Sequence, residues 1–265
     1  MHTDLIFLKL GGSLITDKKS IETARGAVIV RLAHEIHQAL DANPNFRLIL
    51  GHGSGSYGHV AAAKHNTRHG VATKLQWHGF AAVSDAALRL NRIIVDALLM
   101  SGVPAMTISP SASAQCHNGQ LESMSITSVQ AALQAGIVPV IHGDVAFDTV
   151  RGGTIISTEE VMSYLAPHLQ PKWLLLAGET EGVLGPDGHC LDKITPQTYT
   201  DIAPALQGSA GTDVTGGMAS KVIAMLNLTN QLPDLNIRIF SGHPHGHTRT
   251  LLCNPTQPIG TLLTA

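Results

Sequence analysis

The 265-residue sequence has few cysteines and no marked charge excess, and each shortage excludes a class of protein. Its three cysteines, Cys116, Cys190 and Cys253, lie far apart and form no C-x-x-C pair. Neither a disulfide framework nor a zinc site is indicated, so we expect reduced thiols in a cytoplasmic protein. The formal net charge is −2 at pH 7, and duplex nucleic acid favours a strongly basic surface. We therefore expect no nucleic-acid partner.

Long apolar runs and aromatic residues are also scarce. The run "LIFLKL" at residues 5–10 is too short to span a bilayer, and no basic segment precedes it as in a signal peptide. We expect no membrane association. Aromatic residues make up 4%, whereas apolar residues make up 44% and glycine occurs 26 times. This composition is typical of an α/β protein with many tight turns.

Short apolar runs alternate with longer amphipathic segments along the whole chain. The expected strands are residues 4–10, 46–51, 103–109, 136–144, 172–178, 236–242 and 259–265. The expected helices are residues 27–40, 80–102, 157–169 and 218–232. This alternation predicts a three-layer α/β sandwich with a mainly parallel central sheet covered by helices on both faces.

Two chain features refine this prediction. Ser157 is a plausible N-cap, followed by Glu159 and Glu160 in the first turn, where the helix dipole favours carboxylates. Gly102 suits the left-handed end of the long helix before it.

We expect a single domain over residues 1–265, in which the segment 165–172 is the best candidate for a hinge between two lobes, 1–168 and 169–265.

The segment "GHGSGSYGHV" at residues 51–60 contains G-x-G-x-x-G after a strand-like run. A dinucleotide-binding fold also needs an acidic residue about 20 positions later to hold a ribose. Residues 70–79 read "GVATKLQWHG" and contain none. A phosphate-cradling loop needs only the glycines and a donor, and His59 lies where a helix N-terminus is expected. His59 could equally be an ordinary packed or solvent-facing histidine.

Two further segments combine glycines with lysines. In "KLGGSLITDK" (9–18), Lys9 and Lys18 bracket a glycine turn whose N–H groups could form an anion nest. In "GTDVTGGMASK" (211–221), a Gly-Gly pair precedes a helix, and Lys221 lies about one turn into it. Each segment alone could also be a plain turn with solvated lysines.

Other catalytic signatures are missing. The sequence has no G-x-x-x-x-G-K-[ST], no protein-kinase signature and no G-x-S-x-G. His243, His245 and His247 alternate in "GHPHGHT", but this loop has no cysteine or acidic residue nearby. We therefore assign no metal-binding residues.

Taken together, the three glycine and lysine segments resemble the amino acid kinase superfamily. "KLGGS", the glycine-rich loop after the second strand and "TDVTGGMxxK" carry this resemblance. Within the superfamily, "KLGGSLITDK" followed by "HGSGSYGH", "HGD" and "IIS" is similar to the isopentenyl phosphate kinases. The resemblance covers most of the chain, from Lys9 to about Thr261.

This resemblance implies ATP-dependent phosphorylation of isopentenyl phosphate, with Mg²⁺ held mainly by phosphates and with a homodimer. The N-terminal lobe would bind the acceptor and the C-terminal lobe the nucleotide. The implied catalytic residues are Lys9, Lys18, His59, Glu159 and Lys221. The implied ATP-binding residues are Lys9, Leu10, Gly11, Gly12, Ser13, Gly55, Glu179, Gly216, Gly217 and Lys221. The implied acceptor-binding residues are Gly53, Ser54, His59, Ser157 and Thr158.

The sequence departs from the family pattern at three positions. Where the family usually reads I-S-G-D-D, this chain has "ISTEE", so Glu159 replaces an Asp that would organise the lysines. Glu179 in "GETEG" replaces the Asp of a T-D-x-D-G turn, and Tyr57 replaces the usual Phe. The alternatives to this function are a fosfomycin kinase-like phosphonate kinase, a non-catalytic small-molecule sensor and a Rossmann oxidoreductase.

Overall fold

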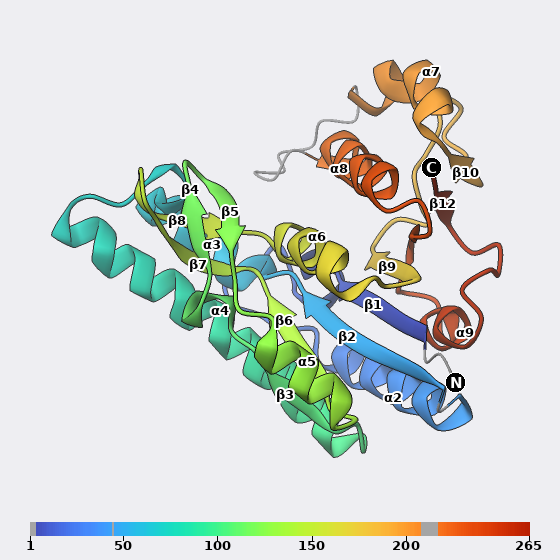
Figure 1. The fold of residues 1–265 in the computed structure, drawn as a ribbon, viewed down its shortest axis with the longest axis horizontal. Coiled ribbons are helices and arrows are strands. Elements are labelled where there is room, and N and C mark those ends of the chain that lie inside the picture. Colours follow the sequence, from blue (N-terminus) through green and yellow to red (C-terminus); the bar gives the residue numbers. More distant parts are fainter. Residues whose placement is uncertain (1–3, 44, 208–216) are drawn as a thin grey trace.

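The computed structural model describes residues 4–43, 45–207 and 217–265, except for the side chains of 59–61, 63–64 and 204–207. Within these residues the largest element is an eight-stranded sheet. Figure 1 shows it crossing the centre of the molecule. Its strands, in spatial order, are β10 (Lys193–Ile194), β12 (Thr261–Leu263), β11 (Asn236–Ser241), β9 (Trp173–Gly178), β1 (Asp4–Leu10), β2 (Phe46–His52), β6 (Val138–His142) and β3 (Ala105–Thr107).

Neighbouring strands of this sheet run parallel except for the pair β11 and β12. The predicted mainly parallel sheet is therefore confirmed. The described helices are α1 (Gly12–Ile15), α2 (Gly26–Ala42), α3 (Gly55–His65), α4 (Lys74–Met100), α5 (Thr127–Gln134), α6 (Thr158–Leu169), α7 (Pro196–Gln207), α8 (Gly217–Gln231) and α9 (His247–Cys253). Short 3₁₀ turns occur at Thr67–His69 and Pro110–Ala112.

Helices cover both faces of the sheet, because successive side chains of a buried strand point in opposite directions. Leu8 and Leu10 of β1 pack in one buried cluster with residues of α2, α4 and α9. Phe7 of the same strand packs in a second cluster with residues of α5, α6 and α8. The predicted three-layer sandwich is confirmed, and β1 lies between its two cores. None of the described helices has the length and apolarity that a bilayer crossing requires.

A smaller four-stranded sheet lies beside α3 and α4, away from α7 and α8 (Figure 1). Its strands, in spatial order, are β5 (Gln120–Ser123), β4 (Gln115–His117), β7 (Asp144–Asp148) and β8 (Gly152–Ile156). The sequence pattern gives no indication of this sheet. The apolar run predicts one strand over 136–144, whereas the chain leaves the main sheet at Gly143 and enters the small one as β7.

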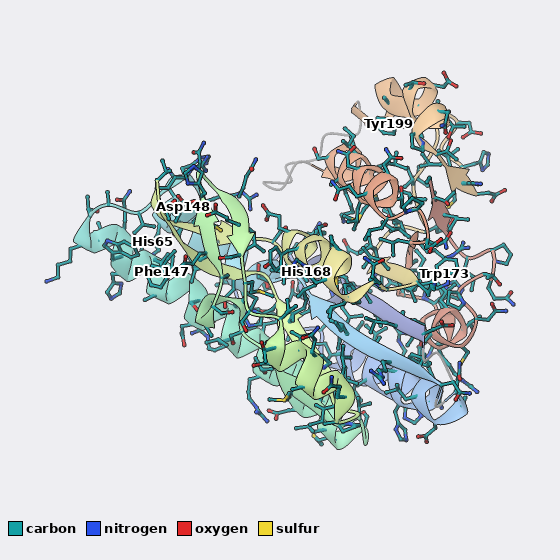
Figure 2. All side chains as sticks on the ribbon, viewed as in Figure 1. His65, Phe147, Asp148, His168, Trp173 and Tyr199 are labelled. Atoms are coloured by element: carbon teal, nitrogen blue, oxygen red, sulfur yellow. The ribbon has the colours of Figure 1, made fainter. Side chains whose placement is uncertain are left out.

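Asp148, labelled in Figure 2, organises one end of the small sheet. Its carboxylate accepts hydrogen bonds from the backbone N–H groups of Asn118, Gly119, Val150 and Arg151. Burial opposes ionisation of this carboxyl group, but these donors outweigh burial and hold its pKa below the ordinary value.

Local capping explains where two helices begin and end. The long helix α4 starts at Lys74, six residues before the expected start, because Thr73 and Gln76 form a capping box ahead of it. It ends before Gly102, whose φ of +87° confirms the expected left-handed glycine. The predicted N-cap at Ser157 is also confirmed, with Glu160 completing the capping box.

Candidate active site

The glycine turns that follow β1 and β2 pack directly against each other. A Cβ atom on Gly12 would lie 2.5 Å from the backbone nitrogen of Gly55, and one on Gly53 would lie 2.8 Å from the nitrogen of Gly12. Gly55 also has a φ of +49°, a backbone conformation that residues with a Cβ atom disfavour. The two turns can approach this closely only because these positions are glycines.

These turns lie at the carboxyl edge of the parallel strands, where α1 and α3 begin. Leu10 and His52, the last residues of β1 and β2, are paired across the sheet. The first N–H groups of each helix have no acceptor within that helix. Adjacent N–H groups of this kind can bind an anion, which is the expectation for residues 11–13, although the N–H of Gly11 donates to Ala177 and that of Ser56 donates to Thr16. Two such turns side by side suit a polyphosphate.

Lys9 and Lys221 meet at the carboxylate of Glu159. Lys9 lies on the same face of β1 as Phe7, so its side chain points toward α6 and α8. Its Nζ is 2.8 Å from Oε1 of Glu159, and the Nζ of Lys221 is 3.8 Å from the same oxygen. The Ser157 cap places Glu159 in the first turn of α6. Thr158 donates a hydrogen bond of 2.6 Å to the carbonyl of His52, which ties this turn to β2.

Glu159 is ionised in this arrangement. Burial opposes its ionisation, but the charges of Lys9 and Lys221 and the hydrogen bond from Lys9 outweigh burial and lower the pKa of Glu159. One carboxylate therefore holds two ammonium groups, and the trio carries a net charge of about +1. Such a trio attracts an anion while keeping the two cations in fixed positions.

Lys18 lies at a different carboxylate, that of Glu179. Glu179 follows β9, the neighbour of β1, and its Oε2 is 3.8 Å from the Nζ of Lys18. Its Oε1 is 3.2 Å from Nη1 of Arg25, a residue that sequence analysis did not select. Glu179 lies beside the first glycine turn, because the N–H of Gly11 donates to the carbonyl of Ala177. The site thus has a second carboxylate shared by two cations.

Two buried histidines, which no sequence motif indicated, support the glycine loops. The rings of His52 and His142 stack with centroids 5.5 Å apart. Nδ1 of His52 lies 3.1 Å from the carbonyl of Gly53, and Nδ1 of His142 lies 3.0 Å from the carbonyl of Gly143. Asn91 of α4 contacts Nε2 of His52 at 3.0 Å. Each histidine therefore ends a strand and holds the carbonyl of the next glycine.

Some residues selected from the sequence cannot be placed. His59 lies in α3, but its side chain is outside the described part of the structure, as is the whole of Gly216. Gly217 begins α8 with a φ of +67°. Ser54 directly precedes α3, and Ser13 lies in α1, so both belong to the paired glycine turns.

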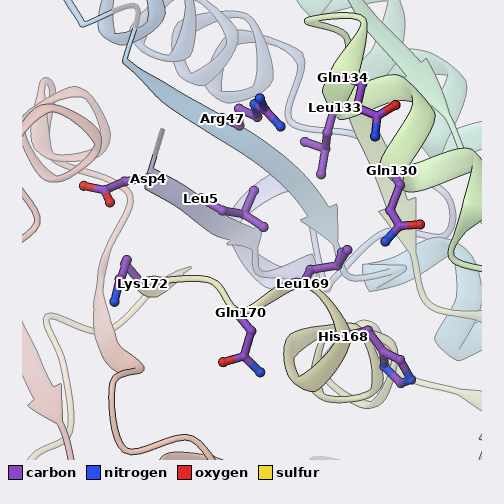
Figure 3. Close-up of a pocket in the computed structure, with 10 residues that line it drawn as sticks. All are labelled: Asp4, Leu5, Arg47, Gln130, Leu133, Gln134, His168, Leu169, Gln170 and Lys172. Atoms are coloured by element: carbon purple, nitrogen blue, oxygen red, sulfur yellow. The ribbon is translucent and has the colours of Figure 1, made fainter. Parts of the chain in front are cut away.

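A cavity of about 710 Å³ lies at the opposite edge of the sheet, at the amino ends of β1 and β2 (Figure 3). Leu5, Leu133 and Leu169 line it together with polar residues that include Arg47 and Gln130. None of the residues selected from the sequence lines it. The cavity and the glycine turns lie at opposite ends of β1 and β2. Seven-residue strands place these ends roughly 20 Å apart.

Comparison with known proteins identifies the family. Residues 4–241 match the model of the amino acid kinase family. The chain belongs to this family. It is 39% identical over 228 residues to isopentenyl phosphate kinase of Haloferax volcanii, covering 84% of this chain and 88% of that protein. It is 33% identical over 240 residues to isopentenyl phosphate kinase of Methanothermobacter thermautotrophicus, covering 86% and 88%.

A solved structure agrees with these relatives. An X-ray structure of isopentenyl phosphate kinase superposes on this chain with a TM-score of 0.82 and 28% sequence identity. The superposition covers 97% of this chain and 99% of that one. The predicted family and fold class are therefore confirmed, and so is the prediction of a kinase.

Proposed function

We propose that this member of the amino acid kinase family transfers the γ-phosphoryl group of ATP to isopentenyl phosphate, producing isopentenyl diphosphate and ADP. The observation that carries the proposal is the Lys9–Glu159–Lys221 trio beside two glycine turns. Relatives named isopentenyl phosphate kinase at 33–39% identity support the choice of acceptor. A sensor would need the glycine turns but no cations aimed at a transferred group.

The chemistry requires charge neutralisation more than proton transfer. An oxygen of the acceptor phosphate attacks the γ-phosphorus, and the bond from that phosphorus to the bridging oxygen of ADP breaks. The acceptor phosphate is already a nucleophile when ionised, so no strong general base is needed. We propose that Lys9 and Lys221 stabilise the charge on the transferred group and on the leaving oxygen. The turns at Gly11–Ser13 and at Gly55 hold the ATP phosphates.

We propose that Mg²⁺ enters with the nucleotide. Among the described residues, no cluster of three or more His, Cys, Asp or Glu side chains is placed to hold a metal ion. Glu159 and Glu179 are each engaged by two cations. The ion would be held mainly by phosphate oxygens of ATP, which the glycine turns position, and it would neutralise part of their charge.

The acceptor is expected on the side of α3 and α4. We propose that Gly53, Ser54, His59, Ser157 and Thr158 hold its phosphate. An apolar cluster formed by Val71, Phe80, Val83 and Val145, with Trp77 packed against it, lies between α4 and the small sheet. It offers an environment for an apolar tail next to the loops that precede α3 and α6. In this arrangement residues 1–168 bind the acceptor, and 169–265 bind the nucleotide, whose phosphates reach the turns at Gly11–Ser13 and Gly55. The homodimer also stays a prediction.

The acceptor proposal is tested by measuring ADP formation with a panel of acceptors. The panel consists of isopentenyl phosphate, dimethylallyl phosphate, fosfomycin, carbamate, glutamate and UMP. We expect kcat/KM to be highest for isopentenyl phosphate, with dimethylallyl phosphate as a poorer acceptor. Preferred turnover of fosfomycin would point to the phosphonate kinase instead. ATP binding without turnover of any acceptor would point to the sensor.

Replacing Lys18 by alanine is expected to lower kcat about 10²-fold while changing KM for ATP much less. We propose that Lys18 meets the γ-phosphoryl group in the transition state, and a loss confined to that state appears in kcat. Steady-state kinetics with varied ATP separate the two constants. Lys19→Ala is the matched control, because Lys19 is the next residue of the same loop. A variant at Lys18 that changes KM alone contradicts this role.

A further inference from the structure

Arg25 and Lys18 hold the carboxylate of Glu179 in different ways. Nη1 of Arg25 is within hydrogen-bonding distance of Oε1, at 3.2 Å, and the Arg25 side chain is 31% exposed. Nζ of Lys18 is 3.8 Å from Oε2, too far for a hydrogen bond, and this side chain is 67% exposed. Arg25 is therefore the fixed partner of Glu179, and Lys18 is the exchangeable one.

The backbone around the two cations supports this distinction. Arg25 directly precedes α2, and its N–H donates to the carbonyl of Ile15 at 2.8 Å. Lys18 lies in a loop that leaves and re-enters the fold at a bridge between Thr16 and Ala24. Arg25 thus directly follows the Thr16–Ala24 bridge that closes the loop carrying Lys18. Glu179 itself is held beside the site, since its carbonyl accepts a hydrogen bond from Ser241.

We propose that Arg25 is a positioning residue that keeps Glu179 neutralised and so leaves Lys18 free to move onto the transferred phosphoryl group. This inference depends on the proposed function. When Lys18 moves to the phosphoryl group, Arg25 remains paired with Glu179, so the carboxylate attracts Lys18 less strongly. Without Arg25, the charge of Glu179 attracts Lys18 alone. The phosphoryl group must then compete with Glu179 for Lys18. Arg25 thus acts through Glu179 without touching the substrate.

A double-mutant cycle tests the inference. Arg25→Gln is expected to lower kcat about 10-fold with isopentenyl phosphate, because Lys18 then stays at the carboxylate of Glu179 for more of the time. KM for ATP is expected to change less than kcat. In a Glu179→Gln background the same substitution is expected to change kcat less than about 2-fold, because no carboxylate remains to compete for Lys18.

Two further variants guard against a general structural effect. Arg25→Lys keeps the charge and is expected to retain most of the activity. Arg92→Gln is the matched control, because Arg92 is an exposed arginine of α4 that pairs with Asp96. An equal loss from Arg25→Gln in both backgrounds overturns the inference, and so does unchanged kcat in the single variant.

A chemical readout separates this inference from the identity of the acceptor. Trace acetylation with acetic anhydride, quantified by mass spectrometry, reports how readily each amine reacts. We expect Lys18 to react more slowly in Arg25→Gln than in the wild type and to recover in the double variant, with the neighbouring Lys19 as internal reference. If the wild-type protein does not phosphorylate isopentenyl phosphate, the proposed function fails, and this readout still tests Arg25. An unchanged Lys18 to Lys19 ratio then overturns the inference.

Discussion

Replacing Glu159 by glutamine is expected to lower kcat for phosphoryl transfer by about 10²- to 10³-fold, the usual cost of losing one preorganised electrostatic element. The neutral amide cannot hold Lys9 and Lys221 together, because the two ammonium groups repel each other once the shared charge is gone. The site becomes more positive, so KM for ATP is expected to stay the same or fall. Initial rates over a range of ATP concentrations measure both constants.

Glu160→Gln is the matched control for this experiment. Glu160 is the next residue in the same turn of α6, and it caps the helix and pairs with Arg68. Glutamine can replace it in a capping box, so kcat is expected to change little. Glu159→Asp should lie between the two, since it keeps the charge on a shorter side chain. If Glu159→Gln raised KM for ATP and left kcat unchanged, Glu159 would serve nucleotide binding alone.

The buried His52 is expected to make the fold acid-labile. Its pKa is lowered to about 3, mainly by burial and further by the neighbouring His142, while a hydrogen bond to Gly53 acts in the opposite direction. In the unfolded chain its pKa is about 6.5. The unfolded state therefore binds a proton first as the pH falls, which favours unfolding. This contribution to stability is complete above about pH 6.5 and is lost as the pH falls toward 3.

The size of this effect follows from linkage. Each pH unit between the two pKa values costs about 1.4 kcal/mol, so the free energy of unfolding should fall by about 2–3 kcal/mol between pH 6.5 and 4.5 from this residue. Urea unfolding of the wild type and of His52→Asn at both pH values measures it. Asparagine is expected to lower stability at pH 7 but to flatten the dependence on pH.

His245→Gln supplies the matched control, because His245 is exposed in the loop before α9. Its substitution should leave the pH dependence of unfolding unchanged. If His52→Asn and the wild type lose the same free energy between pH 6.5 and 4.5, another group causes the acid sensitivity. Protonation leaves the hydrogen bond from Nδ1 to the carbonyl of Gly53 in place, but it removes the Nε2 lone pair that faces the amide nitrogen of Asn91.

The local features of the fold could be predicted because they depend on neighbouring residues. The apolar runs of β1 and β2 and the N-cap at Ser157 indicate their own structure. The long helix was predicted with a late start, because the capping box at Thr73 precedes its apolar pattern. The small sheet was missed, since its strands are short and depend on contacts such as those of Asp148.

The glycine turns and Lys9, Lys18 and Lys221 could be selected from the sequence, because glycine and lysine next to strand ends have a direct chemical meaning. Which carboxylate each lysine pairs with could not be predicted from the sequence. The chain distance from Lys9 to Glu159, or from Arg25 to Glu179, contains no information about which carboxylate meets which cation. Those partners are decided by the order of strands in the sheet and by the side on which each helix packs. The stacked His52 and His142 meet for the same reason, because β2 and β6 are neighbours only in the folded protein.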